Sequence, residues 1–464
     1  MNNKRKEFLI MNKKSVFSSL LALFVSGSAV ASGQGAWRNV RDFGAVGDGK
    51  TVDTKAIQKA IDAGGTVYFP RGTYLTGTIE LKSNGGLLLD EDAVLLASTD
   101  PKDYERKLYD WEKSGVGPGN QTHLIIAVGK ENVFIKGGKI DGNGRTFFAN
   151  ATLRNNFAGG PMKTNPKFWL MQMIMFYDCK HIRINDTILD DSTCWSCFLH
   201  GCEYVTIDNV RVFTDPMIGQ DDGIDIDGCR HVPVSNCVLD VGDDAITLRG
   251  NGNVFAPERP CEWITVSNCI LRSAYAHAIR VGVGNGIIRN AVFSNIAVRD
   301  SHCAVHINSK YSENGIGCNI SNISFRNMQV DVEQLTYICH DYKKVKEVPS
   351  LRSVDNIVFD GIAGNVRLPV VVRGNGKGDM KDLTFSNIKL NVLGDMKGLE
   401  RTKEFLMMKE ADAVFHFYNV KDVDLFNIKL KYEIPQAWKY DVKSVDSKNI
   451  NVEFCRFPQG VVSE

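Results

Sequence analysis

Alternating apolar and polar residues recur along most of the chain around one small polar position, here termed the anchor. The anchor is asparagine at every recurrence except one, where it is glycine: Asn209, Asn236, Asn268, Asn295, Asn327, Gly361, Asn387 and Asn427. Apolar residues stand four and two positions before each anchor and one and three positions after it, with Gly364 as the exception. The column two positions before the anchor reads Ile207, Val234, Val266, Phe293, Phe325, Phe359, Phe385 and Leu425. This period of two predicts two short strands that meet at the anchor.

The anchor itself predicts a bend between the two strands. The step from the apolar residue two before the anchor to the apolar residue one after it is three positions, so both face inward only if the chain turns there. Asparagine is the non-glycine residue that best tolerates the left-handed conformation such a bend requires, and glycine tolerates it without penalty. A strand, a tight bend and a strand, repeated at intervals of about 23 to 40 residues, are typical of a right-handed parallel β-helix.

The same pattern extends toward the N-terminus, to anchors at Asp186 and Gly137. About ten coils therefore form one solenoid, and the sequence predicts an all-β chain with a single parallel β-helix domain over residues 32–464. An antiparallel sandwich is the alternative for so many short strands.

The first segment has the features of a signal peptide. Basic residues that include Lys4, Arg5 and Lys6 precede the apolar run Val16–Val25, and Ala29–Ala31 is a small-residue cleavage site. We expect residues 1–31 to be removed after Ala31 and the protein to be secreted or periplasmic, with no membrane contact afterwards. An uncleaved membrane anchor is the alternative.

The charge balance and the cysteines limit the kinds of partner and cofactor that the sequence predicts. The chain has 55 basic and 54 acidic side chains, a net charge of +1, which gives no reason to expect nucleic acid as a partner. Two of its 12 cysteines, Cys237 and Cys269, fall in the inward column and are expected to pack as small apolar residues. Cys194 and Cys197 lack a second ligand pair, so we expect a structural role for them rather than zinc binding or redox use. No metal and no cofactor is expected, and we expect a monomer.

A third segment in each coil carries the candidate chemistry. When the inward pairs that begin at Ile224, Ile246 and Ile279 are aligned, the position two residues earlier is occupied by Asp222, Asp244 and His277 on consecutive coils, with Asp243 next to Asp244. Adjacent coils are about 4.8 Å apart. Carboxylates this close raise at least one carboxyl pKa, which lets one site hold a general acid and a general base. An aspartate ladder that binds Ca²⁺ or caps turns is the alternative.

At this point the chain resembles a known family. The segments Arg41–Lys50 and Gly72–Tyr74 are similar to the opening of pectin-lyase-fold enzymes, and Ile140–Gly144, Asp222–Asp225 and Gly242–Asp244 resemble the polygalacturonases, family 28 of the glycoside hydrolases. The resemblance runs from about Arg41 to the C-terminal coils.

The resemblance implies inverting hydrolysis of an α-linked chain that contains galacturonate. It implies that Asp243 is the general acid, that Asp222 and Asp244 hold and activate water, and that His277 tunes the acid or orients the sugar. The expected partner is a polysaccharide or oligosaccharide.

The chain also departs from the family pattern. The family's Asn-Thr-Asp reads Gln220-Asp221-Asp222 here, its Gly-His-Gly has alanines on both sides of His277, and its Arg-Ile-Lys reads His306-Ile307-Asn308. Both cations that usually grip the uronate carboxylate are therefore missing. This puts plain polygalacturonate in doubt and favours a branched or rhamnose-containing galacturonan.

Two arginines on neighbouring coils are candidates to replace those cations. Arg280 is outward at the height of His306, and Arg249 is outward at the height of Asn308. We predict that Arg280, Arg249, His306, Asn308 and Gln220 contact the substrate. The alternative is that each arginine is an exposed, solvated side chain on the sheet.

Other functions on the same fold remain open. A polysaccharide lyase or a uronate epimerase is one, although lyases usually use a Lys, Arg or Tyr base and the three-aspartate stack suits hydrolysis better. A non-catalytic carbohydrate-binding solenoid is another.

Overall fold

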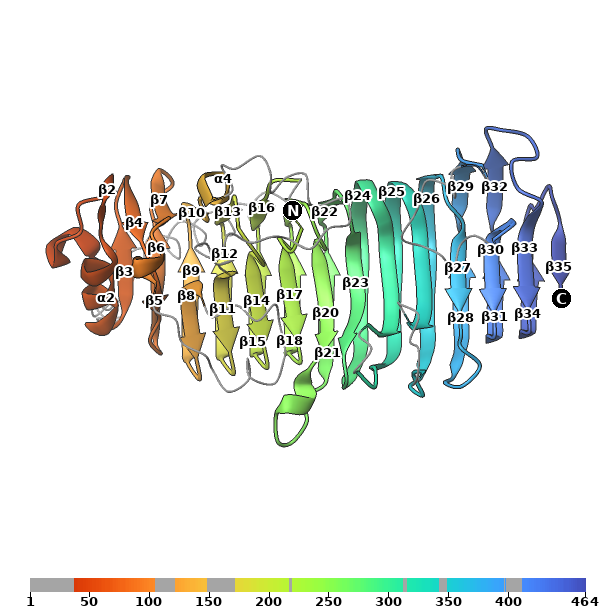
Figure 1. Cartoon of the computed structure of the whole chain (residues 1–464), viewed down its shortest axis with the longest axis horizontal. Coiled ribbons are helices and arrows are strands. Elements are labelled where there is room, and N and C mark those ends of the chain that lie inside the picture. The colour runs from red at the N-terminus through yellow and green to blue at the C-terminus, as the bar shows by residue number, and fades with distance from the viewer. Residues whose placement is uncertain are drawn as a thin grey trace, which may run out of the picture. The chain divides into compact units, whose positions relative to one another are not determined.

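The computed structural model describes residues 37–104, 122–147, 172–216, 219–311, 315–341, 349–395, 397 and 411–464. The predicted signal peptide lies outside the described residues. The compact unit runs from Trp37 to Glu464, and within it the strands follow one another along a single axis (Figure 1).

The strands form three parallel sheets, and most coils contribute one strand to each sheet. Sheet 1 contains the strands that precede the anchors: β1 (Arg38–Asn39), β3 (Thr66–Phe69), β6 (Gly85–Leu89), β9 (Glu131–Lys136), β12 (Lys180–Asn185), β15 (Glu203–Asp208), β18 (Arg230–Ser235), β21 (Cys261–Ser267), β28 (Met380–Ser386), β31 (Lys421–Phe426) and β34 (Lys448–Glu453). Three long strands bend between sheets: β24 (Ile287–Lys310) and β25 (Asn319–Asp341) pass through all three, and β26 (Val354–Val366) passes through the first two.

Sheet 2 contains the strands that follow the anchors: β2 (Asp48–Val52), β4 (Gly72–Thr76), β7 (Ala93–Ala97), β10 (Lys139–Asp141), β13 (Ile188–Asp190), β16 (Arg211–Phe213), β19 (Val238–Val241), β22 (Ile270–Ser273), β29 (Lys389–Val392) and β32 (Lys429–Tyr432). Sheet 3 contains β5 (Ile79–Glu80), β8 (His123–Val128), β11 (Gln172–Tyr177), β14 (Cys197–His200), β17 (Ile224–Asp227), β20 (Ile246–Gly250), β23 (His277–Gly284), β27 (Val370–Arg373), β30 (Ala413–Tyr418), β33 (Tyr440–Val445) and β35 (Val461–Ser463). The predicted right-handed parallel β-helix is confirmed. The structure adds the rungs β3 and β6 before the predicted coils and β34 after them.

The anchors form the bends that the sequence predicts. Their φ angles are all positive, for example 56° at Asn268 and 55° at Asn295. Their side chains also bond to one another along the axis, since Asn268 donates to Asn236 at 3.3 Å and Asn295 donates to Asn268 at 3.4 Å. The predicted bends are therefore confirmed, and the anchor asparagines form a ladder that combines a tolerated backbone conformation with satisfied amides.

The inward columns form the core. Ile207 aligns with Val234, and Val234 with Val266, and all three are buried. The four phenylalanines that continue this column stack on one another with ring centroids 5.0, 4.8 and 5.1 Å apart. The glycine that interrupts the neighbouring column, Gly364, has a φ of 143°, and a Cβ there would lie 1.8 Å from the Val330 carbonyl oxygen. Close backbone approach therefore explains this exception.

The cysteines pack in the same interior. All twelve are free, and all except Cys455 are buried. Cys237 and Cys269 occupy the predicted inward column, and Cys194 and Cys197 are buried beside the base of sheet 3. Burial raises the pKa of Cys197 and of Cys194, which keeps both as thiols.

A second left-handed position recurs in each coil, near the start of the strand in sheet 1. Most coils carry asparagine or aspartate there, at Asn132, Asn290, Asn322, Asn356, Asp382, Asp422 and Asn449. Four consecutive coils instead carry aromatic side chains, at His181, Tyr204, His231 and Trp263. The sequence pattern did not predict this second series, because tyrosine and tryptophan are not typical of the left-handed region, although histidine is found there more often.

The few helices lie at the first coils and in connections. The helix α2 (Thr54–Asp62) buries Ile57, Ala60 and Ile61, while α4 (Gly144–Phe147) and the 3₁₀ turns η1 (Val40–Phe43), η2 (Pro101–Asp103) and η3 (Gly252–Val254) are short. A terminal cap such as α2 covers apolar surface that the next coil would otherwise bury. Within the described ranges, no helix has the length and apolar character needed to cross a membrane.

We predict that Asn268→Ala destabilises the protein more than Asn268→Gly, by about 1 kcal/mol. Both variants lose the ladder hydrogen bonds, but only alanine is strained at a φ of 56°. Urea unfolding followed by circular dichroism measures the difference. An alanine variant at least as stable as the glycine variant would show that the bend imposes no conformational cost.

Candidate active site

The strands β17, β20 and β23 place the predicted chemistry on three neighbouring coils. Ile224 aligns with Ile246, and Ile246 with Ile279, so the residues two positions earlier also stack. Backbone bonds continue to that level, because Gly223 N donates to Asp244 O at 2.9 Å and Ala245 N donates to the His277 carbonyl oxygen at 3.0 Å. The structure thus brings Asp222, Asp244 and His277 together, as the spacing predicts.

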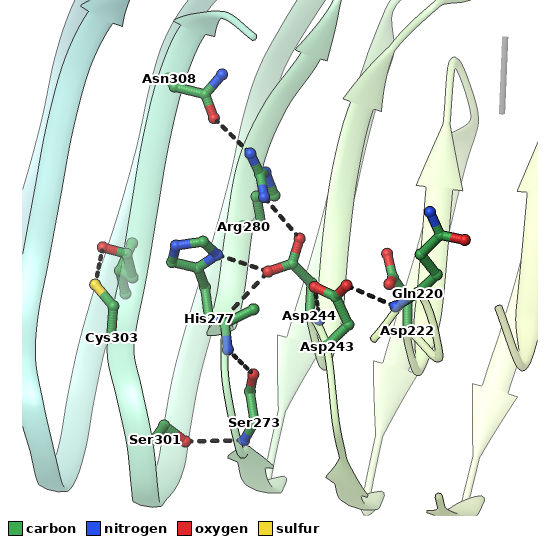
Figure 2. Close-up of polar contacts among 12 residues, drawn as sticks. Gln220, Asp222, Asp243, Asp244, Ser273, His277, Arg280, Ser301, Cys303 and Asn308 are labelled. Atoms are coloured by element: carbon green, nitrogen blue, oxygen red, sulfur yellow. Dashed lines mark hydrogen bonds and ion pairs between the residues drawn. The ribbon is translucent and has the colours of Figure 1, made fainter. Parts of the chain in front are cut away.

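Asp244 lies at the centre of the site and binds two partners from the next coil (Figure 2). Its Oδ1 accepts from His277 Nδ1 at 2.6 Å, and its Oδ2 accepts from Arg280 Nη1 at 3.0 Å. Burial alone would raise the pKa of Asp244, but the charge of Arg280 and the contact with His277 hold it well below its usual range. Asp244 is therefore a permanent carboxylate.

His277 is oriented by that contact. A carboxylate can only accept a hydrogen bond, so Nδ1 of His277 carries the proton and Nε2 is an acceptor. Burial lowers the pKa of His277, opposed by Asp244, and Nε2 is buried without a hydrogen-bond partner in the described part of the chain. The ring thus presents an unused acceptor next to the carboxylates.

Asp222 has a different arginine. Arg249 Nη2 donates to Asp222 Oδ2 at 2.9 Å, and its Nε donates to Asp225 Oδ1 at 2.7 Å. The guanidinium also lies 4.1 Å from the ring centre of Trp195. Burial and then the charge of Asp225 raise the pKa of Asp222, and Arg249 opposes that rise. Asp222 therefore has a higher proton affinity than Asp244.

Asp243 differs from Asp222 and Asp244 because no arginine forms an ion pair with it within the described part of the chain. It is also partly exposed. Its Oδ2 accepts from the Gln220 backbone N at 2.8 Å, and its Oδ1 accepts from the Asp244 backbone N at 3.0 Å. Burial raises the pKa of Asp243 to about 6, and the charge of Asp244 adds to the rise. The site therefore divides into two carboxyls that arginines bind, Asp222 and Asp244, and one, Asp243, that backbone N–H groups bind. Burial raises the pKa of both Asp222 and Asp243, whereas that of Asp244 is lowered.

Gln220 contributes its backbone to this site. Its φ is 74°, which turns its N–H toward Asp243. Asp221 lies beneath, where its Oδ1 accepts from the Asp243 backbone N at 3.1 Å. The predicted contact of the Gln220 side chain with substrate stays a prediction.

The two residues that replace the expected cations are buried. The His306 ring lies 4.3 Å from the His277 ring and 5.2 Å from the Tyr337 ring, centre to centre, and has no exposed surface. Burial holds the pKa of His306 well below its usual range, so the ring is neutral. Asn308 is equally buried and accepts from Arg280 Nη2 at 3.5 Å. Direct contact of either with substrate stays a prediction.

The alternative that Arg249 and Arg280 are solvated is wrong. They are 8% and 6% exposed, and both are bound to site carboxylates. Arg280 also lies 4.6 Å from the ring centre of Tyr311. A role for either arginine in holding the substrate stays a prediction, and the structure adds that each already orients a carboxylate.

Sequence reasoning assigned no role to Asp225, Asp221 or Trp195. Asp225 faces outward and aligns with Thr247, two residues before the outward Arg249 of the next coil, and this spacing of an acid and an arginine is the signal that would have identified it. Among the residues that the structure describes, no three or more His, Cys, Asp or Glu side chains are grouped as metal ligands.

With this geometry in place, comparison with known proteins defines the class. The profile described as Glycosyl hydrolases family 28 matches residues 103–447, and the profile described as Rhamnogalacturonase A/epimerase, pectate lyase-like, matches residues 37–88. The chain therefore belongs to family 28 of the glycosyl hydrolases. It is a polygalacturonase-like glycoside hydrolase.

Individual relatives agree with this class. The chain is 25% identical over 381 residues to a probable polygalacturonase of Vitis vinifera, covering 77% of this chain and 74% of that protein. It is 28% identical over 413 residues to the exo-poly-alpha-D-galacturonosidase of Dickeya chrysanthemi, covering 76% and 67%. The solved family 28 exopolygalacturonase of Yersinia enterocolitica superposes with a TM-score of 0.67 at 21% identity, covering 90% of this chain and 78% of that one, which shows the shared fold.

We predict that kcat/KM falls as pH rises through about 6, because the raised pKa of Asp243 marks the loss of its proton. The same group links stability to pH. An unfolded aspartate has a pKa of roughly 4, so the contribution of Asp243 to stability is present below that pH and is lost as pH rises through about 6. A pH–rate profile, and urea unfolding of the parent and Asp243→Asn at pH 4 and pH 7, measure both effects. A kcat/KM that is flat between pH 5 and 8 contradicts the assignment.

We predict that Arg280→Met destabilises the fold by about 3 kcal/mol, because it leaves the buried Asp244 carboxylate without its cation. The double variant Arg280→Met/Asp244→Asn should recover most of the loss, since the uncompensated charge is gone. Denaturant unfolding of the two single variants and the double variant gives the coupling. Additive losses would mean that the two side chains are energetically independent.

Proposed function

We propose that this protein hydrolyses an α-linked pectic chain that contains galacturonate, with inversion at the anomeric carbon. One observation carries the proposal: Asp222 and Asp244 are bound by arginines, whereas Asp243 is bound by backbone N–H groups, is partly exposed and has a pKa raised to about 6. An inverting hydrolase needs such a division between a proton donor and carboxylates that hold the water.

The reaction follows from this division. Asp243 donates its proton to the glycosidic oxygen as the bond from that oxygen to the anomeric carbon breaks. A water held by Asp222 and Asp244 attacks the anomeric carbon from the opposite face of the sugar. The water proton passes to Asp222, because its pKa is raised relative to that of Asp244. The products are a new reducing end and a new non-reducing end, and a second proton transfer through solvent restores Asp243 and Asp222.

The identity of the sugar rests on the family resemblance and on the relatives, whose names specify polygalacturonase and exo-poly-alpha-D-galacturonosidase. The absence of the family's two cations at His306 and Asn308 favours a neutral residue beside the galacturonate. We therefore propose a rhamnose-containing galacturonan over plain polygalacturonate.

We also propose that the enzyme is secreted or periplasmic. The support is the signal-like segment that ends at Ala31, which lies outside the described residues. N-terminal sequencing of the protein recovered from the medium or periplasm tests this proposal. An intact Met1 in the cytoplasmic fraction contradicts it.

Product analysis tests the reaction. Incubation with a panel of pectic oligosaccharides should give reducing ends without the absorbance of an unsaturated product, and proton NMR of the first turnovers should show the β-anomer. An unsaturated product would identify a lyase. Initial formation of the α-anomer would identify retention, and the absence of any product would favour a binding protein.

We predict that Asp243→Asn lowers kcat by about 10² to 10⁴, the range for loss of a positioned acid, without loss of folding. Asp331→Asn is the control, because Asp331 is a half-exposed carboxylate that pairs with Arg367 on sheet 2. Turnover is measured with the best substrate of the panel. Near-parent turnover in Asp243→Asn would remove Asp243 from the acid role.

A further inference from the structure

The surface of sheet 1 carries a row of exposed aromatic side chains, on a different sheet from the strands that the catalytic carboxylates precede. His181, Tyr204, His231 and Trp263 occupy equivalent positions on β12, β15, β18 and β21, four neighbouring coils (Figure 1). Their φ angles are 56°, 56°, 59° and 58°. Bulky residues rarely adopt this conformation, and the other coils carry asparagine or aspartate at most of the same positions.

Burial does not compensate for this unfavourable backbone. Tyr204 is 50% exposed and Trp263 is 55% exposed, so the rings contribute little to the core. Three of the four rings stack, since the His181 and Tyr204 ring centres are 5.1 Å apart and those of Tyr204 and His231 are 4.8 Å apart, with planes within 9°. Strain that is kept at an exposed position points to a function for the side chains.

The aromatic row ends at a groove. Beyond Trp263 the next coils carry the short side chains Asn290, Asn322 and Asn356, and the change in height leaves a groove of about 410 Å³. Thr265 and Arg326 also border it. This volume falls at the lower end of the range of roughly 300 to 1,000 Å³ for small-ligand sites.

The exposed lining of the groove is mostly apolar, and it contains no carboxylate among the described residues. Its polar part comes from the asparagines, Thr265, Ser324 and Arg326. The asparagines form a fixed ladder, in which Asn322 donates to Asn290 at 3.1 Å and Asn356 donates to Asn322 at 2.8 Å. Their amide groups have further donors and acceptors, and Arg326, which pairs with Asp360 at 2.9 Å, supplies the positive charge. Apolar ring faces, amides in a row and an arginine suit a polymer of sugar rings with hydroxyl and carboxylate groups.

We propose that the aromatic row and the groove together bind a segment of the polysaccharide substrate, at a site separate from the active site. The catalytic carboxylates precede strands of sheet 3, whereas the groove lies over sheet 1. The identity of the bound chain as pectic rests on the proposed function. A second site of this kind holds a long polymer on the enzyme without contacting the bond that is cleaved, so it affects polymers and leaves short oligosaccharides unaffected.

The test replaces aromatic residues of the row by asparagine, which other coils carry at the same position. Trp263→Asn and Tyr204→Asn introduce asparagine at left-handed positions, which it tolerates, so both variants should fold at least as well as the parent. Trp37→Asn is the matched control, because Trp37 is 60% exposed and its ring lies 5.4 Å from that of Tyr68, on coils at the start of the solenoid.

Binding is measured in an Asp243→Asn background by affinity electrophoresis in gels that contain polygalacturonate or rhamnogalacturonan, so that the polymer is not consumed. Trp263→Asn/Tyr204→Asn should weaken retention by roughly three- to tenfold, the loss expected from aromatic contacts, while Trp37→Asn leaves it unchanged. In the active enzyme the same pair should raise KM for the polymer and leave kcat/KM for a trisaccharide at the parent value.

Each outcome separates the two proposals. Unchanged retention in the double variant, or an equal loss of trisaccharide cleavage, overturns the second site. The second site is also overturned if sedimentation shows that the parent is a dimer and that Trp263→Asn dissociates it. A second copy of the chain would then cover the aromatic row. If the parent is retained by the polymer but cleaves no pectic chain, the second site is supported and the proposed function is contradicted. If the parent cleaves short oligosaccharides but is not retained by the polymer, the proposed function is supported and the second site is contradicted.

Discussion

Every functional distance in this protein depends on the backbone hydrogen bonds that hold one coil in register with the next. Those bonds place Ile224, Ile246 and Ile279 side by side, and the residues before them follow. The register persists because each coil turns at a left-handed residue, and the asparagine amides tie consecutive turns together. A shift of one residue on one coil would reverse its inward and outward faces and remove its member of the site.

The same register determines the electrostatics of the site. Arg249 reaches back to Asp222, and Arg280 reaches back to Asp244, each from the following coil. Two buried arginines thus stabilise Asp222 and Asp244, the carboxylates that are proposed to hold the water. Asp243 instead accepts from backbone N–H groups and lies next to the charge of Asp244. Three aspartates with the same intrinsic chemistry acquire different proton affinities because their partners differ.

Left-handed positions serve two purposes in this fold. At the anchors they are occupied by residues that tolerate the conformation, and the result is a continuous ladder. At the second series, four coils carry aromatic residues, and two of these, Tyr204 and Trp263, do not favour the conformation, although asparagine stands at the equivalent position of the coil next to Trp263. That contrast between neighbouring coils identifies the aromatic row as a surface with a use beyond folding.

The sequence by itself determined the β-helix, because its signals are local and repeated. An inward column such as Ile207, Val234 and Val266, and an asparagine at each bend, follow from strand geometry and from the conformational preference of asparagine. The stacking of Asp222, Asp244 and His277 followed from aligning those columns. Only the tertiary structure decided that Arg249 and Arg280 are buried and paired and that Asp225 shares Arg249, because pairing depends on how side chains on different coils fill the space above sheet 3. Residue spacing specifies which positions are neighbours, whereas burial and charge pairing arise only once the coils have packed.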